Sequence, residues 1–215
     1  ARLRPGERVL IHGAAGGVGL AAIQYCRHIG AEIFATAGSP EKRDVVRLAG
    51  VAPTHILDSR SLSFAEEIRC LTGGEGVDVV LNCLAGEAIH KSLSVVRPFG
   101  RFLELGKRDF FANTPLGLRP FRNNISYFGI DADQLMAVKP DLAGRLFREM
   151  MDLFEQGVFH PLPYRLFPAE RIVEAFRHMQ QSRHIGKIIV SALPQTEAAP
   201  APAVAPLTLD PEASY

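Results

Sequence analysis

The chain has 215 residues, and 47% of them are hydrophobic, which is enough for a full core. Its formal net charge of +1 gives no electrostatic reason to expect nucleic acid or a membrane surface as a partner. The 3 cysteines and 7 histidines show no metal-ligand spacing, so we expect no metal and a reducing, cytoplasmic compartment. No apolar run reaches membrane-spanning length.

Strand-like runs alternate with helix-like runs over the first part of the chain, which is the pattern of a parallel sheet covered on both faces. The expected strands are residues 9–12, 32–36, 55–57, 77–82, 101–105 and 125–130. The expected helices are residues 17–29, a helix that follows the N-cap Ser39, residues 64–72 after a Ser63–Glu66 capping box, and residues 86–96. The sequence therefore predicts a three-layer, doubly wound α/β fold of the Rossmann type.

The alternation becomes less regular after residue 130. The expected elements there are a helix over 140–156, an extended stretch over 158–167, a helix over 171–181 and a strand over 187–191. We expect a dinucleotide-binding domain (1–157), a return segment (158–191) that would normally complete a second domain, and a disordered Ala/Pro-rich linker (192–215). Because the chain opens a few residues before a strand, we also expect a piece of a longer protein.

The first strand and the first helix are joined by a glycine-rich turn, Gly13-Ala14-Ala15-Gly16-Gly17-Val18-Gly19. Such a turn at a helix N-terminus binds a pyrophosphate, because it offers unpaired N–H groups and the positive end of the helix dipole. We expect all seven residues to contact a dinucleotide. Two spacings fit: G-x-x-x-G-x-G resembles short-chain dehydrogenases, and G-x-x-G-x-x-G resembles the medium-chain superfamily. No tyrosine is followed four places later by lysine, so the catalytic pair of the short-chain family is missing.

The end of the second strand indicates which dinucleotide is bound. An NAD site places an acidic residue there to hold the ribose 2′-hydroxyl. This chain instead has four hydroxyl or cationic residues, Thr36, Ser39, Lys42 and Arg43. Because these groups would pair with a 2′-phosphate, the sequence favours NADPH over NADH. The alternative for Lys42 and Arg43 is an ordinary solvated helix face.

The fifth and sixth strands are followed by Lys107 and by Asp131 and Asp133. The carboxyl ends of parallel strands meet at one edge of a sheet, where ligands bind. A lysine there could protonate a carbanion or bind an enolate oxygen, and a carboxylate could orient the lysine. A surface ion pair without function is nearly as good an interpretation of these three residues.

Three segments, Val77–Ala85, Gly106–Asp109 and His184–Lys187, resemble the enoyl reductase domains of modular polyketide synthases and of animal fatty acid synthase. These domains are zinc-free members of the medium-chain superfamily. The resemblance implies reduction of an enoyl thioester on an acyl carrier protein, with hydride transfer from NADPH to Cβ and protonation at Cα. It also implies neighbouring megasynthase domains as partners and allows a homodimer.

The resemblance assigns the proton donor to Lys107 and its partner to Asp133 or Asp131, a choice that stays open. It adds cofactor contacts that surround the nicotinamide, the ribose and the adenine, namely Arg60, Asn82, Leu84, Ala85, Gly106, Phe128, Gly129 and Lys187. The family has an N-terminal substrate domain, so we expect this chain alone to bind NADPH but to turn over poorly. The alternatives are a free-standing quinone oxidoreductase-like reductase and a non-catalytic docking module.

Overall fold

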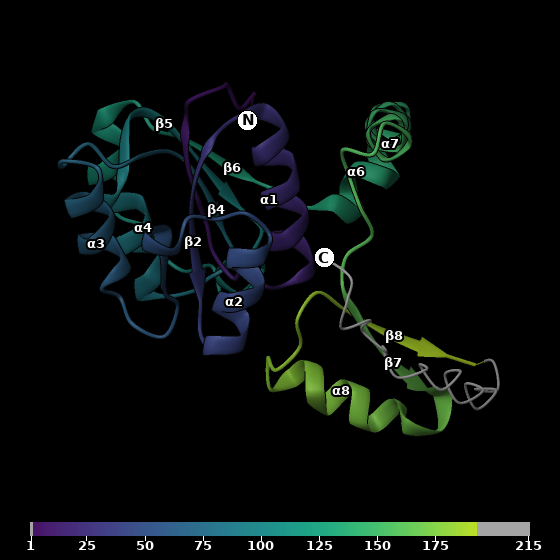
Figure 1. The fold of residues 1–215 in the computed structure, drawn as a ribbon. Coiled ribbons are helices and arrows are strands. Elements are labelled where there is room, and N and C mark those ends of the chain that lie inside the picture. The colour runs from purple at the N-terminus through teal and green to yellow at the C-terminus, as the bar shows by residue number, and fades with distance from the viewer. Residues whose placement is uncertain (1, 193–215) are drawn as a thin grey trace, which may run out of the picture. The chain divides into compact units, whose positions relative to one another are not determined.

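A computed structural model describes residues 2–192 of the chain. It contains a six-stranded parallel sheet with the order β3-β2-β1-β4-β5-β6 (Figure 1). The strands are β1 (Arg8–Ile11), β2 (Glu32–Ala37), β3 (Ile56–Asp58), β4 (Val77–Asn82), β5 (Val96–Glu104) and β6 (Ser126–Gly129). The chain reverses its direction of travel across the sheet between β1 and β4, which makes the sheet doubly wound. The predicted fold class is therefore confirmed.

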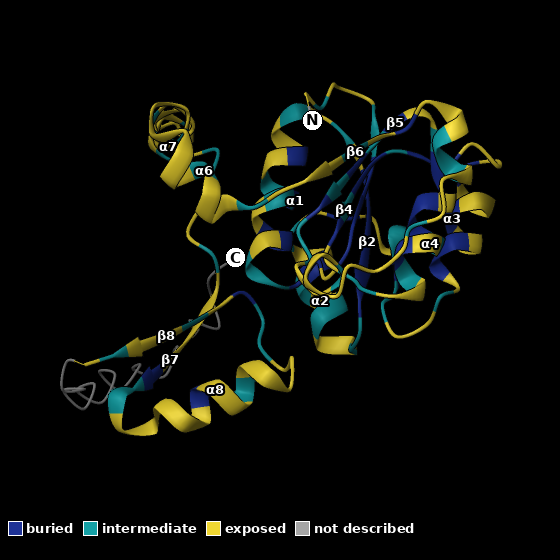
Figure 2. Cartoon of the chain, turned by 180° about the vertical axis from the view of Figure 1, so that it is seen from behind, coloured by how far each residue is buried: buried dark blue, intermediate teal, exposed yellow. Residues whose placement is uncertain are grey.

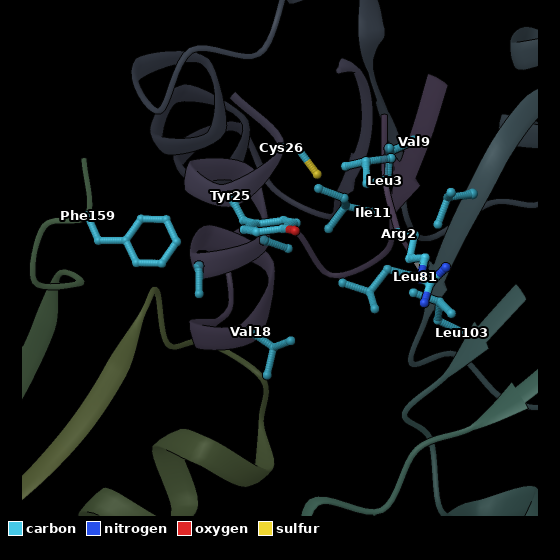
Figure 3. Close-up of a pocket in the computed structure, with 13 residues that line it drawn as sticks. Arg2, Leu3, Val9, Ile11, Val18, Tyr25, Cys26, Leu81, Leu103 and Phe159 are labelled. Carbon is cyan, nitrogen blue, oxygen red and sulfur yellow. The ribbon is translucent and has the colours of Figure 1, made fainter. Parts of the chain in front are cut away.

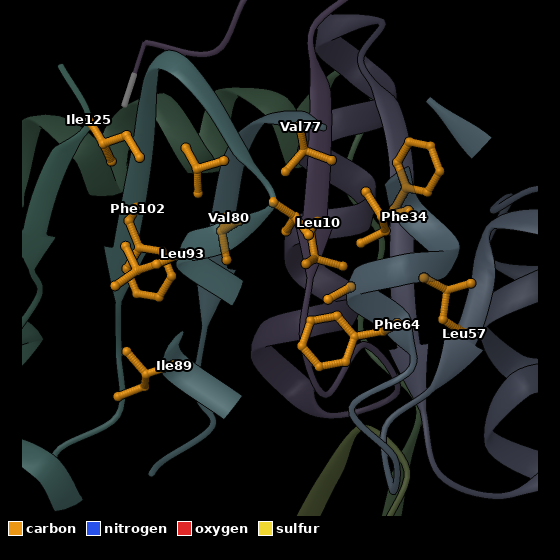
Figure 4. Close-up of a cluster of buried hydrophobic side chains, with 14 residues drawn as sticks. Leu10, Phe34, Leu57, Phe64, Val77, Val80, Ile89, Leu93, Phe102 and Ile125 are labelled. Carbon is orange, nitrogen blue, oxygen red and sulfur yellow. The ribbon is translucent and has the colours of Figure 1, made fainter. Parts of the chain in front are cut away.

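Helices cover both faces of the sheet. On one face lie α1 (Gly17–Ile29) and α2 (Pro40–Leu48), which pack Ile23 and Val46 against the strands. On the other face lie α3 (Phe64–Leu71) and α4 (Glu87–Ser94), whose Phe64 and Leu93 join a core with Phe34 and Phe102 (Figure 4). The strands read as continuous apolar runs because both of their faces are buried in this way.

Local signals set most of the element ends. Gly30 ends α1 in the left-handed conformation, with φ of 78°. Ser39 caps α2 as predicted, because its side chain accepts a hydrogen bond from the backbone N–H of Lys42. The predicted capping box at Ser63 is wrong. Ser63 has helical dihedrals, and its hydroxyl donates to Glu67 Oε1 at 2.6 Å instead of accepting from the backbone.

The connection between β5 and β6 contains two short helices, α5 (Arg108–Phe111) and a 3₁₀ turn at Arg119–Asn123. Another helix, α6 (Ala132–Val138), follows β6 and was not predicted; Asp131 caps it by accepting the N–H of Asp133 at 3.2 Å. The predicted amphipathic helix is α7 (Pro140–Glu155), of which no residue is buried. The exposed residues of α7 are visible in Figure 2.

The described residues form two compact units. The first contains residues up to Tyr164 and also the short segment Ile185–Lys187. The second contains Arg165–His184 and the strand residues after Lys187, with α8 (Ile172–Gln180). Strands β7 (Tyr164–Pro168) and β8 (Lys187–Ser191) pair with each other. The predicted linker falls, from residue 193 on, outside the described residues.

One apolar pocket lies in the first unit, on the sheet face beside α1. It has a volume of about 420 Å³. Its walls come from α1 and from strands β1, β4 and β5, with side chains such as Tyr25, Leu81 and Leu103 (Figure 3). No helix in residues 2–192 is both long enough and apolar enough to cross a membrane.

Candidate cofactor-binding and catalytic site

The glycine turn is closed by backbone hydrogen bonds. The N–H of Gly16 donates to Gly13 O at 2.9 Å, and the N–H of Ala14 donates to Thr36 O at 3.0 Å. Gly19 lies so close to the turn that a Cβ there would come within 2.5 Å of Ala14 Cα. Helix α1 therefore begins in direct contact with the backbone of the turn. Its N-cap, Gly16, has no side chain that could accept hydrogen bonds from the N–H groups of the first helical turn. These residues fit a pyrophosphate.

The segment before β8 brings a cation to the same place. The N–H of Gly186 donates to Ala15 O at 2.8 Å, so residues 185–187 run alongside the glycine turn. The Lys187 side chain passes over Gly17, where a Cβ would lie 2.7 Å from its Nζ. A cation at a helix N-terminus is unfavourable by itself, because it meets the positive end of the dipole. An anion bound between Lys187 and the N-terminus of α1 would interact favourably with both positive groups.

Thr36 does not face the cofactor side as predicted. It is completely buried, and its Oγ1 lies 3.1 Å from His12 Nδ1 and accepts the N–H of Gly13 at 3.3 Å. Ser92 completes the chain: its hydroxyl donates to Ala88 O, so it accepts from His12 Nε2 at 2.8 Å. This assigns the Nε2–H tautomer to His12, whose Nδ1 accepts from Thr36. The Thr36 hydroxyl therefore supports the glycine turn through its hydrogen bond with the N–H of Gly13.

His12 is neutral in this network. Burial lowers its pKa from 6.5 to about 3, so the unfolded chain binds a proton below pH 6.5 that the folded chain does not. We expect the free energy of unfolding to fall by about 1.4 kcal/mol for each pH unit below that value from this group alone. Urea denaturation at a series of pH values should show a steeper loss for the wild type than for His12→Gln. Equal slopes would contradict this assignment.

The end of β2 gathers a different set of cations than predicted. Arg43 is already engaged by protein groups, because its Nη2 lies 3.4 Å from Asp58 Oδ1 and its Nε donates to Ala37 O at 3.2 Å. Lys42 instead lies near Arg60: burial first, and the Arg60 charge second, lower the pKa of Lys42. Two like charges held together favour an anion between them.

Gly38 forms the floor of this cationic corner. A Cβ at Gly38 would lie 2.8 Å from Ser59 Oγ and 3.3 Å from Arg60 Nε, so both side chains close over the glycine. Ser59 was missed by the sequence reasoning. The signal that could have found it is its place directly after β3, the strand that pairs with β2. Ser39, although predicted as a phosphate contact, has its Oγ 3.4 Å from the N–H of Lys42 as a helix cap.

Lys107 meets both candidate aspartates. Its Nζ lies 3.0 Å from Asp131 Oδ1 and 3.0 Å from Asp133 Oδ2. Strands β5 and β6 pair in parallel with Glu104 opposite Gly129, and this register brings the residues after the two strands together. The hydrogen bonds that Lys107 donates to Asp133 and Asp131 raise the pKa of Lys107, and the bond to Asp131 lowers the pKa of that carboxyl. The structure therefore pairs the lysine with both carboxylates, between which the sequence could not choose.

Asn82 is turned away from the cofactor side, contrary to the prediction. It is completely buried, and its Nδ2 donates to Glu104 Oε2 at 2.6 Å and to Leu84 O at 2.8 Å. Leu84 and Ala85, which follow it, are half-buried. The N–H of Gly106 donates to Glu104 Oε1 at 2.6 Å. The side chains of Asn82 and Glu104 are thus used to hold the turns that follow β4 and β5.

The remaining predicted contacts lie at the ends of β6 and β8. Phe128 is 45% exposed, and the ring of Phe110 covers Gly129, where a Cβ would lie 3.1 Å from it. In residues 2–192, no three His, Cys, Asp or Glu side chains come together as a group that could hold a metal ion. The site is therefore built from three parts: the glycine turn with Lys187, the cationic corner after β2, and Lys107 with its two aspartates.

Comparison with known proteins gives consistent findings. The family model described as zinc-binding dehydrogenase matches residues 53–190. A highly reducing polyketide synthase of Cordyceps militaris is 43% identical over 100% of this chain, which spans 9% of that synthase. The crystal structure of CurK enoyl reductase is 46% identical with a TM-score of 0.79, and the match covers 88% of this chain and 56% of that one.

A solved fragment matches this chain over most of both chains. The nucleotide-binding subdomain of the enoylreductase domain of PpsC from Mycobacterium tuberculosis is 45% identical, with a TM-score of 0.69. The match covers 74% of this chain and 88% of that subdomain. A family model over more than half of the chain and a relative covered almost completely leave one assignment. The chain belongs to the enoyl reductase family of polyketide synthases, within the medium-chain dehydrogenase/reductase superfamily.

Proposed function

We propose that this chain binds NADPH and forms the cofactor-binding part of an enoyl reductase that acts on an enoyl thioester carried by an acyl carrier protein. The observation that carries the proposal is Lys107, held between Asp131 and Asp133 at the same sheet edge as the glycine turn. NADPH, when bound, supplies the hydride that is added to Cβ of the double bond. The residues of this chain hold the cofactor, and Lys107 acts on the charge that develops on the substrate.

The pyrophosphate is held by the N-terminus of α1. The first-turn N–H groups point out of the helix and the glycine turn leaves them uncovered, while Lys187 adds a positive charge beside Gly17. Val18, which is 57% exposed, presents only its backbone to the phosphates. The same three features fit NADH and NADPH equally, so this part of the site gives affinity but does not choose between them.

The choice of NADPH is made at the cationic corner after β2. Lys42 and Arg60 meet there with Ser59, and the charged groups match a 2′-phosphate, which offers strong hydrogen-bond acceptors. The carboxylate of Asp58, which precedes Ser59, is engaged by Arg43 and by the N–H of Arg60 at 2.9 Å. An acid tied up in this way is a poor partner for a free ribose hydroxyl.

Lys107 is proposed to stabilise the enolate that remains after hydride addition. The two aspartates raise its pKa, so it stays a charged ammonium at neutral pH and is a weak acid. A fixed positive charge of this kind stabilises a developing oxyanion. The proton that completes reduction then enters at Cα. A docking module without catalysis would have no use for this ion-paired lysine.

The polyketide synthase relatives favour a part of a megasynthase over a free-standing quinone reductase. The proposal also implies the remaining parts of such a synthase as partners: an acyl carrier protein that delivers the substrate, and the substrate-binding part of the reductase domain. A homodimer is compatible with it, and the compartment proposed is the cytoplasm.

A nucleotide titration tests the cofactor choice. We expect Lys42→Ala to weaken NADPH binding about tenfold, the size of one charge-assisted hydrogen bond, and to leave NADH binding unchanged. Nicotinamide fluorescence or calorimetry measures both dissociation constants. Lys139→Ala, which removes an exposed lysine distant in sequence from the corner, is the matched control. Binding of neither nucleotide by the wild type would refute the proposed function, and an equal loss for both would refute the role of Lys42.

A further inference from the structure

A buried polar pair connects the turns that follow β4 and β5. Glu104 is only 2% exposed, and its two carboxylate oxygens accept hydrogen bonds from different turns. Oε2 accepts from Asn82 Nδ2 at 2.6 Å, and Oε1 accepts from the N–H of Gly106 at 2.6 Å. A carboxylate buried to this degree is costly unless its oxygens are satisfied, so the two contacts must be maintained in the folded state.

Asn82 extends the pair into the turn after β4. Its Oδ1 accepts the N–H of Leu84 at 3.3 Å while its Nδ2 donates to Leu84 O at 2.8 Å. The Asn82 side chain is thus hydrogen-bonded to both the N–H and the carbonyl oxygen of Leu84. The other end of that turn is tied by Asp109, whose Oδ2 accepts the N–H of Gly86 at 3.1 Å. Residues 84–86 are therefore held from two directions.

Gly106 shows how closely Glu104 controls the second turn. A Cβ at Gly106 would lie 2.8 Å from Glu104 Oε1, so the carboxylate lies directly under the backbone that leads to Lys107. Burial, the largest effect, raises the pKa of Glu104, while the hydrogen bonds from Asn82 and Gly106 act in the opposite direction. No other part of the proposed site has a carboxylate this deeply buried among the described residues.

We propose that Asn82 and Glu104 are positioning residues: they fix the turn of residues 84–86 and the turn of residues 106–107 so that the nicotinamide half of the cofactor and Lys107 share one geometry. This inference rests on the proposed NADPH-dependent function. It replaces a direct cofactor contact by the Asn82 side chain with an indirect one. We expect the adenosine half of the cofactor to be independent of the pair, because β1 separates β2 from β4 and β5, which carry Asn82 and Glu104.

Glu104→Gln is the sharpest variant. Both groups that Glu104 contacts are donors, so an amide of the same shape must turn its own NH₂ toward one of them. We expect NADPH binding to weaken about tenfold, the size of a lost charge-assisted hydrogen bond, and binding of adenosine 2′,5′-bisphosphate to stay unchanged. That probe carries the 2′-phosphate and lacks the nicotinamide. Glu66→Gln, an exposed glutamate on α3, is the matched control.

The outcomes separate the two levels of the proposal. Selective loss of NADPH binding supports the positioning role, and loss of both nucleotides or of neither overturns it. Circular dichroism shows whether Glu104→Gln folds. If it does not, the same two nucleotides are titrated against Asp109→Ala, which removes the contact to Gly86. Asp109 is only half-buried, so this variant should fold. A wild-type chain that binds neither nucleotide overturns the proposed function together with the positioning role. Wild-type binding with unaffected variants overturns the positioning role alone.

Discussion

Replacing Lys107 by alanine is expected to lower enoyl reduction about 100-fold, which is the scale for one preorganised group that stabilises an oxyanion. The Lys107 ammonium lies 3.0 Å from a carboxylate oxygen on each of Asp131 and Asp133, so its position is fixed before substrate arrives. NADPH binding should not change, because the pyrophosphate and 2′-phosphate are held at other strand ends. The measurement is NADPH oxidation with a crotonyl thioester, in a synthase that contains this chain with the rest of its reductase domain.

Lys107→Arg distinguishes the two roles that a lysine can have here. An arginine keeps the positive charge but does not give up a proton in this pH range. If Lys107 acts through its charge, as proposed, this variant should keep activity within about tenfold of the wild type. A loss as large as that of Lys107→Ala would show that the proton itself comes from Lys107. Arg108→Ala, which changes the neighbouring exposed cation, is the control.

The pH dependence follows from the same contacts. The two aspartates raise the pKa of Lys107 above its ordinary 10.5, so the charged form persists to that pH and is lost only above it. Asp131 has a lowered pKa, so the ion pair is present above about pH 4 and is lost as the pH falls through the lowered value. Between these limits Lys107 contributes no pH dependence to the rate.

The sequence predicted which strand ends carry the candidate residues, but not the direction of every side chain. Successive residues of a strand point to opposite faces of the sheet, so a residue near a strand end need not face a ligand at the sheet edge. Thr36 and Asn82, both predicted as cofactor contacts, are completely buried. Both point inward, because a buried partner, His12 or Glu104, satisfies them. Such a partner is distant in sequence, and no local pattern indicates it.

Residues brought together by β-pairing were predicted better than residues brought together by side-chain packing. The register of β5 and β6 already implies that Lys107 meets the residues after β6. By contrast, Ser59 joins the cationic corner because it lies over Gly38, and Arg43 is engaged at that corner by Asp58. Lys187 lies over Gly17, next to the glycine turn, and only the family resemblance pointed to it, because it is distant from that turn in the sequence.

Gly19→Ala is expected to have the second large effect, on folding and binding together. The new Cβ would meet backbone atoms of Ala14, at 2.5 Å from Cα and 2.6 Å from O, and backbone cannot move aside as a side chain can. Overpacking of this kind costs about 1–3 kcal/mol, against a gain of about 0.5–1 kcal/mol from replacing a helical glycine. Helix α1 must shift, so we also expect NADPH affinity to fall more than about tenfold.

Two further glycines make the Gly19 result interpretable. Gly117→Ala should change nothing, because no atom lies within 4 Å of a Cβ there. At Gly17 the three atoms nearest to the added Cβ all belong to the flexible end of Lys187, so Gly17→Ala should weaken NADPH binding while the urea midpoint stays near that of the wild type. The two variants then distinguish an effect on stability from an effect on binding. Gly19 is needed for α1 to begin against Ala14, and Gly17 is needed for Lys187 to reach the phosphates. Normal stability and normal binding in Gly19→Ala would refute this account, because the helix would then not begin against the turn.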